Sequence, residues 1–228
     1  MLFSVLRNGN LNGVEKLLYL LILVFCVLLS LTVHELCHGL AAYWMGDKTA
    51  KSSGRLSMNP LHHLEPMGAL CLFLFGFGWA RPVPVNPWNF KHKKAGMVLT
   101  SLAGPISNFL LAFVAQLGTV LLFQVLYTTG EVTVGYRLAE VCHMICYYLV
   151  VINLGLGIFN LIPVPPLDGS KVLTAILPAR LYFWLMQWER YGFIILIILI
   201  NLPFFNSFLY SCENVILSFY NLLIGVLL

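Results

Sequence analysis

Long apolar stretches alternate with short polar segments along the 228 residues of this chain. A helix that crosses a bilayer needs about 20 consecutive apolar residues. The stretches that approach or exceed this length are residues 17–33, 97–127, 141–162 and 191–210. The pattern therefore predicts an all-α polytopic membrane protein with about five to six transmembrane or re-entrant helices.

The polar segments indicate where these helices begin and end. The first helix is predicted to run from about residue 14 to about residue 45, longer than a bilayer is thick, with Gly46-Asp47 as its stop. The apolar run at residues 67–78 is only a dozen residues long and contains three glycines, so it is as typical of a re-entrant segment as of a span. Residues 81–88, RPVPVNPW, contain three prolines, which favour a short extended or β segment within the region of residues 50–90.

Further prolines interrupt the helix predicted at residues 141–162. Pro163, Pro165 and Pro166 cannot all be helical, so this helix is expected to break between residues 160 and 169. Two further apolar segments close the chain, and no polar stretch is long enough for a separate soluble domain. Residues 1–228 are therefore predicted to form a single membrane domain.

Composition and charge agree with a membrane protein and indicate its orientation. Apolar side chains make up 60% of the chain and charged ones 10%, against about a quarter charged in soluble domains. The positive-inside rule places the C-terminal end of the first helix on the cytoplasmic side of the cell membrane. The basic residues behind this prediction lie between the first and third long helices or after the fourth, and they are Lys48, Lys51, Arg55, Arg81, Lys91, Lys93, Lys94, Lys171 and Arg180. No nucleic-acid partner is expected, because the lysines are scattered among prolines and tryptophans at a membrane boundary.

The six cysteines nearly all lie in apolar segments, where cysteine packs as a small hydrophobic residue and no disulfide framework is indicated. Cys142, His143 and Cys146 have a spacing that could suit a second metal site. No further ligand cluster accompanies them, so ordinary packing is the simpler interpretation.

The most informative motif, His34-Glu35-Leu36-Cys37-His38, has the form H-E-x-x-H and follows directly on the first apolar stretch. On a helix, His34 and His38 point about 40° apart and can share a zinc ion, and Glu35 on their flank can take a proton from a water molecule that the metal activates. The alternative is a pair of structural histidines. Ionisable residues in a membrane helix are costly, however, and are usually functional.

Zinc usually takes a third protein ligand, and Asp168 is the candidate. It lies in NLIPVPPLDG, where the prolines break the fourth helix in or near the membrane. An aspartate at this depth is expensive unless a positive charge neutralises it, which a zinc ion shared with the first helix would do. The alternative is that Asp168 caps a short helix at residues 169–177.

With these motifs in place, the chain resembles the site-2 protease family of intramembrane zinc metalloproteases. The resemblance covers most of the chain and implies a compact member, without an inserted PDZ domain or an appended nucleotide-sensing domain. The stretches that carry it are, in order, HELCH (34–38), GRLSMNPLHHLEPMG (54–68), GWARPVPVNP (78–87), AGPISN (103–108) and NLIPVPPLDG (160–169).

The resemblance also implies roles for individual residues. It implies that His34, His38 and Asp168 bind one zinc ion per chain, and that Glu35 acts first as general base and then as general acid. It further implies that Asn160 contacts the substrate or the developing oxyanion. The extended segment that, by the same resemblance, holds an unwound substrate comprises Arg81, Pro82, Val83, Pro84 and Val85.

The chain departs from the family pattern at a few positions. Cys37 replaces a common glycine and points away from the metal face, so a packing change is expected. Glu65 stands where aspartate is common, which leaves its role open. His63 matches a family histidine and His62 does not, and we expect both to order a loop and not to bind metal.

The sequence thus predicts a zinc metalloprotease that hydrolyses peptide bonds of transmembrane protein substrates near the cytoplasmic face of the bilayer. One alternative is a catalytically silent membrane scaffold or chaperone of the same fold, which would need a degraded site, whereas all four site residues are present. A second is a zinc transporter. Transporters carry polar residues at several depths, whereas the metal-competent residues here gather near one face.

Overall fold

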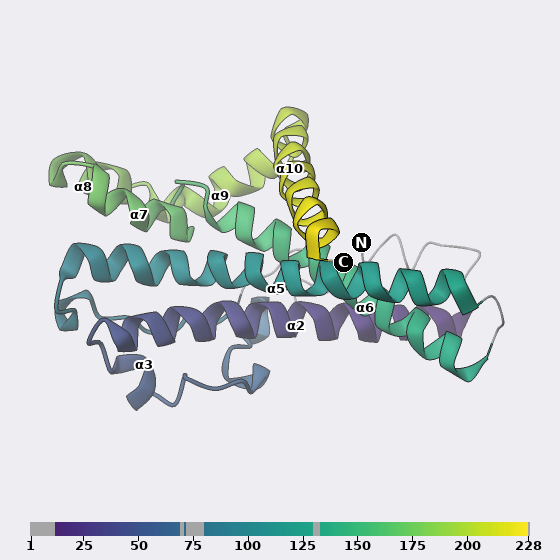
Figure 1. Ribbon diagram of the computed structural model, residues 1–228. Helices are drawn as coiled ribbons and strands as arrows, with labels where there is room; N and C mark the ends of the chain where they lie inside the picture. Colours follow the sequence, from purple (N-terminus) through teal and green to yellow (C-terminus); the bar gives the residue numbers. More distant parts are fainter. Residues whose placement is uncertain (1–11, 69–70, 72–79, 130–132, 228) are drawn as a thin grey trace.

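The computed structural model describes residues 12–68, 71, 80–129 and 133–227, which form a bundle of long helices (Figure 1). The predicted all-α polytopic fold is confirmed, although fewer helices of spanning length occur among the described residues than the five to six expected. The helices that are long and apolar enough to cross a membrane are α2 (Gly13–Trp44), α5 (Lys93–Thr129), α6 (Val134–Asn160) and α10 (Pro203–Leu227).

Helix α2 follows the predicted bounds because clear signals mark both of its ends. At its start, the Asn12 side chain accepts a hydrogen bond from the Glu15 amide, and the Glu15 carboxylate accepts one from the Asn12 amide. At its end, Gly46 adopts a φ of 110°, which glycine reaches without strain. The chain then turns into the short helix α3 (Thr49–Ser52).

Helix α5 runs antiparallel to α2 and packs against both α2 and α6 (Figure 1). Small and branched side chains fill the space where the helices meet, and the α10 residue Tyr220 closes it by donating a hydrogen bond to the Phe109 carbonyl at 2.9 Å. Many large apolar side chains on the outside of the long helices are exposed, as expected for surfaces that face lipid. The buried core residues are Ile22, Cys26, Ala112, Ala115, Leu149, Val150, Leu154 and Tyr220.

The region between α2 and α5 contains the predicted extended segment but no β-strand among its described residues. Residues 80–86 are extended, between the short 3₁₀ helices η1 (Pro60–His62) and η2 (Pro87–Asn89). The β alternative is wrong for these residues because their backbone binds the side chains of Glu35, Arg55 and Asp47 and the carbonyl of His63, none of which belongs to a strand. Pro82 and Pro84 also lack the N–H groups that a ladder needs.

Asp47 fixes the far end of this segment to α2. Its buried carboxylate accepts hydrogen bonds from the Asn86 amide at 2.7 Å, the Asn89 side chain at 2.8 Å and the Thr49 amide at 3.0 Å. Burial alone would raise the pKa of Asp47, but these hydrogen bonds outweigh it and lower the pKa below its usual value.

The chain breaks after α6, as predicted, and then forms three short helices: α7 (Asp168–Ile176), α8 (Ala179–Met186) and α9 (Glu189–Ile200). The predicted span at residues 191–210 is wrong. The helix stops at Ile200, and α10 begins at Pro203, because proline cannot donate to the preceding turn and disfavours a helical residue before it.

Two further predictions are not tested. The re-entrant segment predicted at residues 67–78 lies outside the described residues except for residues 67, 68 and 71. That residues 1–228 form a single domain stays a prediction.

Candidate metal centre

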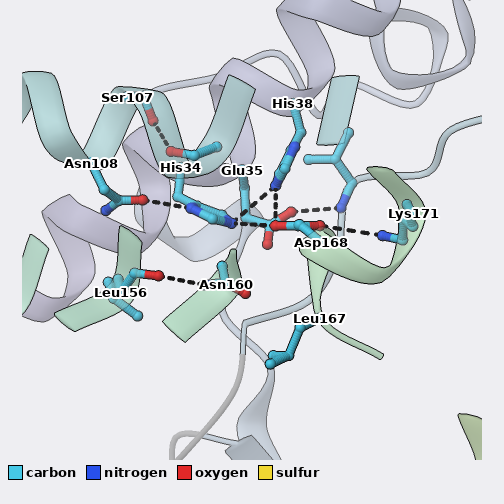
Figure 2. Close-up of polar contacts among 12 residues, drawn as sticks. His34, Glu35, His38, Ser107, Asn108, Leu156, Asn160, Leu167, Asp168 and Lys171 are labelled. Carbon is cyan, nitrogen blue, oxygen red and sulfur yellow. Dashed lines mark hydrogen bonds and ion pairs between the residues drawn. The ribbon is translucent and has the colours of Figure 1, made fainter. Parts of the chain in front are cut away.

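Three ionisable side chains from two distant parts of the chain meet at one point. His34 and His38 project from the same face of α2, and Asp168 reaches them from the first turn of α7 (Figure 2). The Oδ2 atom of Asp168 lies 3.2 Å from Nε2 of His34 and 3.0 Å from Nε2 of His38, and the two Nε2 atoms are 2.9 Å apart. All three side chains are buried.

The other nitrogen of each imidazole faces an oxygen of α5. Nδ1 of His38 lies 2.6 Å from the Thr100 carbonyl oxygen, and Nδ1 of His34 lies 2.5 Å from Oδ1 of Asn108. A carbonyl oxygen can only accept, so each Nδ1 carries the proton and each Nε2 keeps its lone pair.

This set of donor atoms fits a zinc ion. Two imidazole lone pairs and a carboxylate oxygen converge, and three acceptors this close repel one another unless a cation lies between them. In a tetrahedral zinc site with ligand distances of about 2.1 Å, neighbouring ligand atoms are about 3.4 Å apart. The observed separations of 2.9 to 3.2 Å are close to this value. A third ligand beside two histidines leaves the fourth position for water or substrate.

Asp168 does not cap its helix, so the capping alternative is wrong. Leu167 occupies the cap position of α7, and no side chain there bonds to the backbone. One carboxylate oxygen of Asp168 faces the histidines, and the other lies 3.3 Å from Nζ of Lys171 (Figure 2). The positive charge of Lys171 beside it favours the ionised carboxylate, which is the form that binds a metal.

Gly104 is a residue of this centre to which the sequence analysis assigned no role. A Cβ atom at this position would lie 2.3 Å from Nε2 of His38 and 2.7 Å from Cε1 of His34. The missing side chain therefore lets the α5 backbone pass directly against the two rings. The sequence does contain a signal for this role. Inside a helix a glycine is less favourable than alanine by about 1 kcal/mol and a proline by about 3 kcal/mol, so a glycine followed by Pro105 indicates a packing or functional requirement.

Glu35 connects the metal centre to the extended segment. Its Oε2 atom accepts a hydrogen bond from the Val83 amide at 2.9 Å. The guanidinium of the buried Arg55 holds the same segment from the other side by donating to the Arg81 carbonyl at 2.5 Å. The structure thus brings the predicted substrate segment beside the predicted general base, and Arg55 is an anchor that the sequence analysis missed.

A cavity of about 330 Å³ opens between these elements. The three candidate ligands, Glu35 and Asn160 all line this cavity. The side-chain NH₂ group of Asn160 donates one hydrogen to the Leu156 carbonyl at 3.0 Å, which leaves its second hydrogen and the side-chain oxygen for other partners (Figure 2). Arg81 and Pro84 of the predicted segment do not line the cavity, whereas Pro82, Val83 and Val85 do. Its remaining lining residues are Pro87, Met97, Thr100, Ser101, Pro166 and Lys171.

The residues whose roles were open lie outside the centre. His63 is buried, with Nε2 2.9 Å from the Ser57 carbonyl, and its own carbonyl accepts from the Arg81 amide at 2.8 Å, so it orders the loop. The Glu65 carboxylate accepts a hydrogen bond from the Gly68 amide. His62 and Cys37 are not among the grouped donors.

The second metal site considered at Cys142, His143 and Cys146 is not supported. Within the described residues, only His34, His38 and Asp168 form a group of three or more donors close enough to share an ion. Cys146 instead packs against Gly118 of α5.

Comparisons with known proteins point in the same direction. A model of peptidase family M50 matches residues 22–199, a region that contains every residue of the metal centre. "Putative zinc metalloprotease YwhC" of Bacillus subtilis (strain 168) is 38% identical over 192 residues, which cover 84% of this chain and 85% of that protein. "Putative zinc metalloprotease Rip2" of Mycobacterium tuberculosis (strain ATCC 25618 / H37Rv) is 28% identical over 190 residues, or 81% of this chain and 68% of that protein. No solved structure matches the chain.

Proposed function

The chain belongs to peptidase family M50 and is a zinc metalloprotease with several helices that can span a membrane, and from this we propose that it cleaves transmembrane proteins at a site reached from the cytoplasm. The observation that carries the proposal is the junction of three groups at one cavity. A zinc-competent cluster, the Glu35 carboxylate and an extended backbone segment all border it.

The proposed ligands are His34, His38 and Asp168, and Glu35 is the proposed general base. Zinc, when bound, supplies a Lewis acid that polarises a carbonyl group and makes water more acidic. Glu35 takes a proton from the water molecule that attacks the scissile carbonyl carbon. When the C–N bond breaks, Glu35 returns that proton to the leaving nitrogen, so its carboxylate is regenerated.

Asn160 is the proposed donor to the substrate carbonyl oxygen. Its amide lines the cavity and has one N–H beyond the bond to Leu156. A fixed donor at an oxygen that becomes negative in the transition state typically contributes a factor of about 100 to about 1,000 in rate. We therefore assign Asn160 to oxyanion stabilisation.

The residues of the extended segment at 81–85 are the proposed docking edge for the substrate. A transmembrane helix hides its carbonyl groups in hydrogen bonds, so it must unwind locally before it can be cleaved. Arg55 and Glu35 hold this segment in a fixed shape along the cavity, so an unwound chain can lie against it beside the metal centre.

The depth of the cluster supports a substrate within the bilayer. The 32 residues of α2 span about 48 Å, against about 30 Å of hydrocarbon. His34 lies ten residues before the last residue of α2, Trp44, and so about 15 Å from that end. When the excess length of α2 is shared equally between its two ends, the cluster lies just inside one edge of the hydrocarbon layer and not at its centre.

The distribution of charge supports the cytoplasmic orientation. The end of α2 nearest the cluster and the start of α5 lie at one end of the bundle (Figure 1), together with most of the basic residues. At the other end, the described residues before and at the start of α6 include Arg137, which is paired with Glu140 at 3.1 Å. By the positive-inside rule the cluster end faces the cytoplasm.

The catalytic roles are tested with the purified full chain in liposomes. The probe is a synthetic transmembrane peptide of about 20 apolar residues with a Gly-Asn pair in its cytoplasmic half and dyes at its ends. Wild type should cleave it, and Glu35→Gln should bind zinc equally well but lose cleavage. Turnover by Glu35→Gln at the wild-type rate would contradict the assigned base.

A soluble unfolded protein such as casein, assayed in parallel, separates the substrate class from the chemistry. Glu35-dependent cleavage of casein with an intact transmembrane peptide would overturn the transmembrane substrate and leave the metalloprotease in place.

Orientation is tested separately with a membrane-impermeant maleimide. Ser53→Cys and Gly135→Cys place new thiols at exposed positions at opposite ends of the bundle, and the unmodified chain gives the background. In intact cells Gly135→Cys should react and Ser53→Cys should not. The reverse pattern would overturn the cytoplasmic site.

A further inference from the structure

A line of buried polar side chains leads away from the metal centre through the middle of the bundle. It starts at His34, continues to Asn108 on α5 and Asn153 on α6, and ends at Ser30 on α2. Nδ1 of His34 is 2.5 Å from Oδ1 of Asn108, Nδ2 of Asn108 is 2.6 Å from Oδ1 of Asn153, and Nδ2 of Asn153 is 2.8 Å from Oγ of Ser30. Asn108, Asn153 and Ser30 are completely buried.

The direction of every hydrogen bond in this line is set by two backbone carbonyls at its far end. The Ser30 hydroxyl donates to the Cys26 carbonyl at 2.7 Å, so its oxygen is left to accept from Asn153. Asn153 donates its second amide hydrogen to the Leu149 carbonyl at 2.8 Å. Because a carbonyl only accepts, the NH₂ group of Asn153 must face this side, and its oxygen must face Asn108.

The remaining bonds follow in the same direction. Asn108 must present its NH₂ group to Asn153, which turns its oxygen toward His34. The proton of the His34 ring is then held at Nδ1, and the Nε2 lone pair is directed at the point that it shares with His38 and Asp168 (Figure 2).

We infer that Asn153 and Ser30, together with Asn108, are positioning residues that select the metal-binding tautomer of His34. The inference rests on the proposed role of His34 as a zinc ligand. Asn153 and Ser30 are not among the residues that line the cavity, and no hydrogen bond joins either of them to a candidate ligand. They act only through the orientation of the Asn108 amide.

A purely structural role would not depend on this direction. Polar pairs between membrane helices hold the helices together whichever way the amide points. A role in selecting the tautomer predicts that removing the Asn153 oxygen alters zinc binding more than it alters folding.

The first test is Asn153→Leu, which keeps the number and branching of the side-chain heavy atoms and removes both polar ends of the amide. The Asn108 amide is then free to reverse and to offer its NH₂ group to Nδ1 of His34, which moves the ring proton to Nε2, where it blocks the metal. Zinc affinity should fall about 10- to 100-fold, as for other residues that orient metal-bound histidines. Asn153→Asp should restore most of the affinity, because a protonated carboxyl can accept from Asn108 and donate to the Leu149 carbonyl.

The matched control is Gln116→Leu. Gln116 on α5 donates to Asn221 on α10 at 2.8 Å, so this change removes another amide bond between helices that is not connected to the histidines. It should leave zinc affinity at the wild-type value. The assay is competition with a chelator on the full chain in detergent, with thermal melting of the zinc-free protein as the check on folding.

The outcomes separate this inference from the proposed site. If His34→Ala binds zinc as wild type does, the proposed site is wrong. If His34→Ala loses zinc but Asn153→Leu binds it with wild-type affinity, the selection of the tautomer is wrong. Should Asn153→Leu fail to fold, Asn108→Asp and Asn108→Leu decide. Asn108→Asp keeps an oxygen that accepts from Nδ1 of His34 and should retain zinc binding, whereas Asn108→Leu has no acceptor and should lose zinc. Equal zinc affinities of the two variants would overturn the inference.

Discussion

Replacing Gly104 with alanine tests how closely α5 must approach the metal centre. The new Cβ would lie 2.3 Å from Nε2 of His38 and 2.7 Å from Cε1 of His34, where ordinary contacts begin at 3.4 Å. The overlap with the nearer atom is therefore about 1 Å, and it falls on the atom that would bind the metal. Either the rings rotate or α5 moves away by a similar distance.

Both responses disturb zinc binding more than folding. A zinc site tolerates ligand displacements of about 0.2 Å, so a shift of about 1 Å removes at least one ligand from bonding distance. We expect zinc affinity to fall about 100-fold or more, which corresponds to about 2.7 kcal/mol or more. Folding of the zinc-free chain should change less, because alanine favours the helix by about 1 kcal/mol over glycine and offsets part of the steric cost of about 1–3 kcal/mol.

The experiment compares Gly104→Ala with Gly225→Ala, a glycine of α10 whose Cβ would meet nothing within 4 Å. Zinc affinity is measured by competition with a chelator, and thermal melting is followed in the presence of EDTA. Gly225→Ala should bind zinc as wild type does. If Gly104→Ala also binds one zinc per chain with wild-type affinity, the close packing of α5 on the two histidines does not control the site.

Three further predictions concern the surroundings of the site. Because the pKa of Asp47 is lowered in the folded state, its ionised carboxylate stabilises the fold above the unfolded pKa of about 3.9, and this stabilisation is lost as the pH falls through the folded pKa. Asp47→Asn should therefore melt at a lower temperature than wild type at neutral pH, and the difference in melting temperature should shrink in acid. A difference that does not change with pH would contradict this. Arg55→Met should release the segment at 81–85 and lower kcat/KM about tenfold by raising KM at unchanged zinc content, so an unchanged KM in the peptide assay would contradict the anchor. Lys171→Met removes the ion pair that orients Asp168, and chelator competition should show zinc affinity reduced by about tenfold, whereas tighter binding would exclude an orienting role.

The parts of the fold that the sequence predicts well are those with local signals. The end of α2 follows from Gly46, and the break after α6 follows from three prolines in four residues. The span expected at residues 191–210 is wrong because hydropathy alone does not register a single proline at 203, which divides an apolar stretch into α9 and α10. The β alternative for the segment at 80–86 is wrong because its partners, which include the side chains of Arg55 and Glu35, do not belong to a strand, and no sequence period signals such contacts.

The polar line behind His34 shows where reasoning from the sequence must stop in a membrane protein. Ser30, Asn108 and Asn153 each interrupt an apolar helix, and the cost of an unpaired polar group in a bilayer predicts that each has a partner. Which partner it has depends on the rotation and vertical register of three helices, and Ser30 and Asn153 are 123 residues apart in the chain. A shift of one residue turns a helix by about 100°, so it would exchange these polar residues for apolar neighbours and break the line. The packing that seals the core is thus the same packing that orients His34, and the variants at Asn153 test that register as well as the tautomer.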